Sequence, residues 1–106
     1  VLGHYNDRYQ SSGHLYMVRV PGISLLQRDR IIRKMAEAGV ACNVHYKPLP
    51  MMTAYKNLGF DIADYPNAYR RFENEITLPL HTRLTDEEAD YVAGQFCKIV
   101  RGCTGP

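Results

Sequence analysis

Two segments of the chain carry both the start signal and the apolar spacing of an amphipathic α-helix. Ser24 with Gln27, and Thr85 with Glu88, form the sequence pattern of a capping box. The apolar residues that follow recur at helical spacing: Ile31, Ile32, Met35 and Ala36 in the first segment, and Ala89, Val92, Ala93, Phe96, Ile99 and Val100 in the second. Gly39 is suited to end the first helix. The fold must therefore bury one face of each of two helices.

Three other segments have the alternation of short β-strands. Residues 14–20 are rich in aromatic and β-branched side chains, and residues 40–46 alternate between an apolar and a more polar set. Ile76, Leu78 and Leu80 alternate in the same way, and shorter helices are predicted at residues 51–58 and from Pro66 to about residue 74. The predicted fold class is α+β, a small three-stranded, mainly antiparallel sheet covered on one face by helices.

Length and composition narrow the range of functions. A chain of 106 residues suits one domain, and 13 basic against 11 acidic residues do not indicate a nucleic-acid or membrane partner. Arg28, Arg30, Arg33 and Lys34 are interpreted as a solvated helix face. Three cysteines suit a reducing cytoplasm better than a disulfide framework. The chain starts at Val1, and we expect it to be an excerpt of a longer protein.

The residues alone offer few candidates for chemistry. The sequence contains no glycine-rich phosphate loop, no nucleophile elbow and no zinc-binding helix motif. Cys42 and His45 have a spacing that metals use, but strand alternation puts them on opposite faces, so no metal site is expected. His45 shares the non-core face with Asn43 and precedes the turn at Pro48, which makes it a candidate binding residue. A hydrogen bond from its ring to a backbone carbonyl is the structural alternative.

Several stretches in order carry a family resemblance. They are residues 14–20, residues 38–49, and residues 75–80 continuing into residues 84–88. Between them, Ala54-Tyr55, Leu58-Gly59 and Asp64-Tyr65-Pro66 keep the same order and spacing. Together these stretches resemble the C-terminal part of the DegT/DnrJ/EryC1/StrS family of sugar aminotransferases. Many members have a second histidine after the His-Tyr pair, where this chain has Pro50.

The resemblance implies a pyridoxal-phosphate enzyme of fold type I, in which a large domain holds the cofactor and a small C-terminal domain closes over it. Such enzymes move an amino group, typically from glutamate, to a keto sugar linked to a nucleoside diphosphate. The cofactor is the electron sink, and a lysine of the large domain forms the Schiff base. The four lysines here are Lys34, Lys47, Lys56 and Lys98, and none lies in the family's cofactor motif.

On this interpretation, the chain itself contributes no catalytic residue and binds no pyridoxal phosphate alone. Residues 1–13 are expected to be a linker from the large domain, residues 14–101 the small domain and residues 102–106 a tail. His45 and Asn43 are the predicted substrate-binding residues, with Tyr46 packed inward. The expected partners are the large domain, a second copy of the whole enzyme in a homodimer, and the nucleotide-sugar substrate.

Three alternatives remain open at this stage. Some members of the family use the cofactor to remove a hydroxyl group, as sugar dehydratases. A free-standing α+β module that binds a small ligand or has a regulatory role would show the same order of helices and strands. A purely structural interaction domain would also fit.

Overall fold

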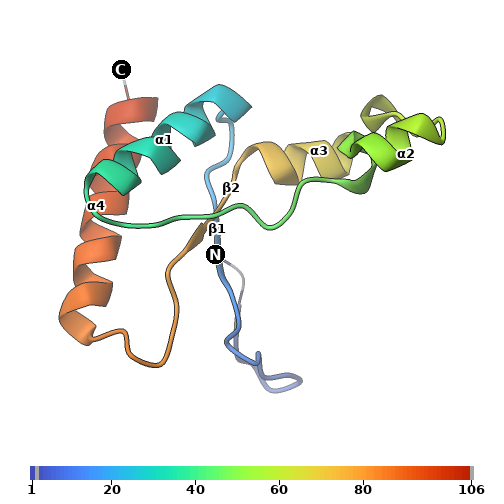
Figure 1. Ribbon diagram of the computed structural model, residues 1–106. Helices are drawn as coiled ribbons and strands as arrows, with labels where there is room; N and C mark the ends of the chain where they lie inside the picture. The colour runs from blue at the N-terminus through green and yellow to red at the C-terminus, as the bar shows by residue number, and fades with distance from the viewer. Residues whose placement is uncertain (2, 106) are drawn as a thin grey trace.

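The two long helices form as the capping patterns predict. The computed structural model describes residue 1 and residues 3–105, and in it α1 (Leu25–Glu37) and α4 (Asp86–Thr104) pack against each other (Figure 1). Both capping boxes are present, at Ser24 and at Thr85. Gly39 follows α1 with a left-handed φ of 83°. Helix α4 continues to Thr104, so most of the predicted tail from residue 102 onward is helical.

The sheet has two strands, and the prediction of three is wrong. Strand β1 (Tyr16–Arg19) pairs antiparallel with β2 (Glu75–Leu78), with Met17 opposite Thr77. The segment of residues 40–46 contributes an isolated bridge between Asn43 and Thr77, on the other edge of β2. Strand β2 therefore lies between β1 and this segment.

Two local features stop the third strand from forming. If the pairing continued in register from the Asn43–Thr77 bridge, Ala41 would face Pro79 and His45 would face Glu75. Pro79 has no N–H to donate to such a ladder. The backbone N–H of His45 donates to the Glu75 side chain at Oε2, at 2.9 Å, instead of to a strand carbonyl. Pairing is therefore confined to a single residue.

The middle of the chain forms an arm that points away from α1 and α4 (Figure 1). It contains two short 3₁₀ turns, η1 (Leu49–Met51) and η2 (Ile62–Asp64), and two helices, α2 (Thr53–Asn57) and α3 (Pro66–Glu73). The radius of gyration is 15.6 Å, whereas a compact domain of this length has about 13 Å. Among the residues described, no helix is both long and apolar enough to cross a membrane.

The N-terminal segment, predicted as a linker, contains a tight turn. Tyr5 and Gln10 form an antiparallel bridge, and the Asn6 side chain accepts a hydrogen bond from the Arg8 N–H at 2.7 Å. The His4 ring stacks on Tyr16 of β1, with ring centroids 5.9 Å apart. The turn is thus placed beside the start of β1.

The core lies between the two long helices and one face of the sheet. Its buried apolar side chains are Ile23, Ile31, Met35, Val40, Ile76, Leu78 and Phe96. Arg28 also lies inside, only 4% exposed, which corrects its assignment to a solvated face, whereas Arg30, Arg33 and Lys34 are exposed. Its guanidinium donates to the Phe72 carbonyl at 2.6 Å and lies over the Phe72 ring. Arg28 therefore ties α1 to the last turn of α3.

We expect Met35→Ala to lower the free energy of unfolding by about 2 to 5 kcal/mol, because it leaves a cavity in the core. The Met35 side chain is fully buried (0% exposed), whereas Leu26 on the same helix is 82% exposed. Leu26→Ala is the matched control and should change the stability little. Urea unfolding followed by circular dichroism measures both, and equal losses would contradict this description of the core.

The three cysteines should differ in reactivity. Burial against the core raises the pKa of the Cys42 thiol to about 11, and Cys97 is exposed on α4. Only the thiolate reacts, so a raised pKa leaves less of the reactive form at pH 8. In a variant that keeps only Cys42, we expect iodoacetamide to react about 10- to 100-fold more slowly than in one that keeps only Cys97. Mass spectrometry measures both rates, and equal rates would contradict the burial of Cys42.

Candidate functional site

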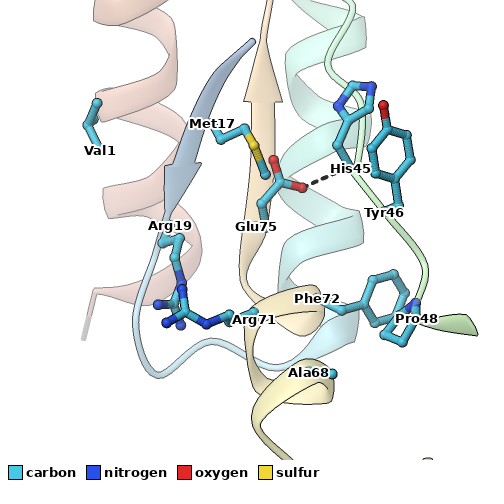
Figure 2. Close-up of a pocket in the computed structure, with 10 residues that line it drawn as sticks. All are labelled: Val1, Met17, Arg19, His45, Tyr46, Pro48, Ala68, Arg71, Phe72 and Glu75. Atoms are coloured by element: carbon cyan, nitrogen blue, oxygen red, sulfur yellow. Dashed lines mark hydrogen bonds between the residues drawn. The ribbon is translucent and has the colours of Figure 1, made fainter. Parts of the chain in front are cut away.

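A pocket of about 460 Å³ lies on the sheet face away from the core. Met17 and Arg19 of β1 and Glu75 of β2 contribute to it, because strand alternation turns them away from Val18 and Ile76. The rest of the lining comes from His45, Tyr46 and Pro48, from Ala68, Arg71 and Phe72 of α3, and from Val1 (Figure 2). The pocket thus joins both strands, α3, the segment after Asn43 and the N-terminus.

A buried hydrogen-bond network holds His45 at this pocket. The Glu75 carboxylate, only 4% exposed, accepts the His45 backbone N–H at 2.9 Å and the Thr77 hydroxyl at 2.5 Å. Thr77 Oγ1 is also 2.8 Å from Nδ1 of the His45 ring. The same strand that forms the core therefore orients the imidazole.

The residues on either side of His45 are placed differently from one another. Asn43 is exposed, and its side-chain oxygen accepts the Val44 N–H at 2.8 Å, so it does not line the pocket. Tyr46 lines the pocket but is 68% exposed, so the expectation that it packs inward is wrong for this chain. Its ring meets the His45 ring edge-on, with centroids 4.6 Å apart, and a cis peptide bond joins the two residues.

Two arginines give the pocket a positive side. Arg19 donates through Nε to the buried Asn74 side chain at 3.1 Å, which leaves the other guanidinium N–H groups free for a ligand. Arg71 is exposed on α3. Within the described part of the chain, the one ion pair is Arg28 with Asp29, so neither pocket arginine has a carboxylate partner. Paired guanidinium groups of this kind favour phosphate or carboxylate ligands.

Of the residues at this site, His45 was predicted from the sequence, whereas Arg19, Arg71, Glu75 and Thr77 were not. A signal existed for two of them, since Glu75 and Thr77 alternate with Ile76 and Leu78 along one strand. No local pattern indicated that the arginines meet at the pocket. For residues 1 and 3–105, no group of three metal-binding side chains lies together.

The comparisons with known proteins agree with this fold. Residues 2–97 match the DegT/DnrJ/EryC1/StrS aminotransferase family. Spr1654 of Streptococcus pneumoniae is assigned as a sugar aminotransferase and has been solved in apo, PLP and PMP forms. It is 57% identical to this chain with a TM-score of 0.93, and the match covers 96% of this chain and 26% of Spr1654. PseC of Helicobacter pylori, an aminotransferase in pseudoaminic acid biosynthesis, is 28% identical with a TM-score of 0.80, covering 88% and 25%.

A relative known from its sequence gives the same result. The UDP-4-amino-4,6-dideoxy-N-acetyl-beta-L-altrosamine transaminase of Campylobacter jejuni is 29% identical over 94 residues, which are 89% of this chain and 25% of the relative. The chain thus spans about a quarter of the length of these proteins. From residue 2 to residue 97, nearly its whole length, the chain belongs to the DegT/DnrJ/EryC1/StrS aminotransferase family.

Proposed function

We propose that the chain is the C-terminal small domain of a pyridoxal-phosphate-dependent aminotransferase that transfers an amino group, from glutamate, to a nucleotide-linked keto sugar. The observation that carries this proposal is the 57% identity and TM-score of 0.93 with Spr1654, a protein solved in PLP and PMP forms. In the proposed division, residues 1–13 lead from the large domain, residues 14–101 form the small domain and residues 102–106 form its end.

The substrate class follows from the names of relatives. The Campylobacter jejuni relative is named for a UDP-linked sugar. A Saccharopolyspora spinosa relative, 33% identical over 97 residues, is named dTDP-4-dehydro-2,3,6-trideoxy-D-glucose 4-aminotransferase. Both names state amino transfer, so we propose amino transfer rather than the removal of a hydroxyl group. We also propose that the intact enzyme is a cytoplasmic homodimer.

The pocket suits an anionic ligand that also carries hydroxyl groups. Among the described residues Arg19 and Arg71 have no carboxylate partner, so their guanidinium N–H groups can bind the diphosphate of a nucleotide sugar. The His45 imidazole, held by Thr77, can contact a sugar oxygen. We propose that Asn43 contacts the substrate at the rim of the pocket, because its side chain is exposed.

The pocket residues suit the recognition of an anion but not covalent attachment of the cofactor. Pyridoxal phosphate supplies the electron sink for this chemistry when it is bound. None of the lysines at positions 34, 47, 56 and 98 lines the pocket. We therefore propose that the cofactor lysine lies in the large domain, and that residues of this chain bind and orient substrate and exclude water.

The intact protein should bind pyridoxal phosphate, and glutamate should convert the bound cofactor to its amine form, which absorbance spectroscopy detects. The chain of residues 1–106 alone should show no saturable cofactor band, because we propose that the attachment site lies in the large domain. A band that saturates and disappears when one lysine of this chain is replaced would contradict the proposal.

We expect His45→Ala in the intact enzyme to lower kcat/KM about 2- to 12-fold, because an ordinary hydrogen bond to a sugar oxygen contributes about 0.5 to 1.5 kcal/mol. The melting temperature should change little. His81→Ala is the matched control, since His81 is exposed and does not line the pocket. Activity near wild type, or a loss that only follows lost stability, would rule out this role for His45.

A further inference from the structure

The hydrogen atoms of the Glu75–Thr77–His45 network can be assigned from its geometry. Both oxygens of the Glu75 carboxylate act as acceptors, Oε2 for the His45 backbone N–H and Oε1 for the Thr77 hydroxyl. The hydroxyl group of Thr77 has one hydrogen, and it donates to Oε1 of Glu75. The single hydroxyl hydrogen of Thr77 is therefore used in the bond to Glu75.

This assignment decides the tautomer of His45. Because the Thr77 hydroxyl hydrogen points to Glu75, Thr77 Oγ1 can only accept from the His45 ring, 2.8 Å away. Nδ1 must then carry a hydrogen. In the neutral imidazole the other nitrogen, Nε2, is left with a free lone pair.

Nε2 is also the ring nitrogen that remains open to a ligand. Among residues 1 and 3–105, the ring has a hydrogen bond at Nδ1 and no protein partner at Nε2. The same part of the chain contains no buried side-chain nitrogen or oxygen without a partner, so Nε2 is accessible. His45 lines the pocket, as Figure 2 shows, beside Glu75 and Tyr46.

We propose that Thr77 and Glu75 are positioning residues that hold His45 as the Nδ1–H tautomer, so that Nε2 accepts a hydrogen bond from the ligand. The ligand group must then be an O–H or N–H donor, such as a sugar hydroxyl. A phosphate oxygen, which only accepts, is instead suited to Arg19 and Arg71. The part of this inference that concerns turnover rests on the proposed function, whereas the tautomer does not.

The test is ¹⁵N solid-state NMR of the intact protein labelled with [¹⁵N]histidine, with the His45 signals assigned by their loss in His45→Gln. At neutral pH the wild-type ring should be protonated at Nδ1 and unprotonated at Nε2. Thr77→Val removes the hydroxyl and keeps the shape of the side chain, so the ring should change to a mixture of tautomers. Thr77→Ser keeps the hydroxyl and should restore the wild-type signals.

Kinetics of the same variants give a second measurement. Loss of one ordinary hydrogen bond costs about 0.5 to 1.5 kcal/mol, so Thr77→Val should lower kcat/KM about 2- to 12-fold. The kcat/KM of Thr77→Ser should stay close to the wild-type value. A proton on Nε2 of the wild-type ring would overturn the inference. This measurement does not depend on the folding of any variant. Unchanged Nδ1 protonation in Thr77→Val would do so as well. A changed tautomer with unchanged turnover would support the inference and count against the proposed role of His45 in catalysis.

Discussion

Burial of β2 on both faces is the constraint on which the rest of the structure depends. All four residues of this strand are buried, although two are apolar and two are polar. Ile76 and Leu78 pack into the core beneath α1 and α4. Glu75 lines the pocket and Thr77 contacts the His45 ring, and burial of polar groups such as these costs free energy unless hydrogen bonds replace water. The strand therefore requires both a helical cover on one side and polar partners on the other.

The hydrogen bonds that the buried Glu75 side chain requires also determine where the sheet ends and where the site forms. Glu75 takes the backbone N–H of His45, which could otherwise have continued the ladder that begins at Asn43. The chain leaves the sheet at this point, and the His45 ring comes to lie against Thr77. One buried carboxylate thus both limits the sheet and orients the imidazole.

Local patterns predicted the parts of the fold that depend on local physics. The capping boxes and the helical spacing are read along the sequence and appear in the structure. The alternation of Ile76, Leu78 and Leu80 predicted a strand, which the structure has as Glu75–Leu78, without Leu80. The third strand was predicted from alternation alone, which cannot show that Pro79 and Glu75 would stand opposite it. The burial of Arg28 depends on Phe72, 44 positions away, and the Arg19–Arg71 side of the pocket depends on the packing of α3. These contacts are tertiary, so no window of sequence contains them.

The pocket residues divide into two groups according to what orients them. His45 and Arg19 are held by buried partners in this chain, Thr77 and Asn74 respectively, so their placement follows from the fold of these residues alone. Tyr46 and Arg71 are exposed, and their long side chains lose conformational freedom only when something covers them. Ordering them costs binding free energy, whereas the imidazole is already oriented. Recognition at this site should therefore begin from a rigid His45 and Arg19, with Tyr46 and Arg71 adjusting to the ligand or to the surface that closes over the pocket.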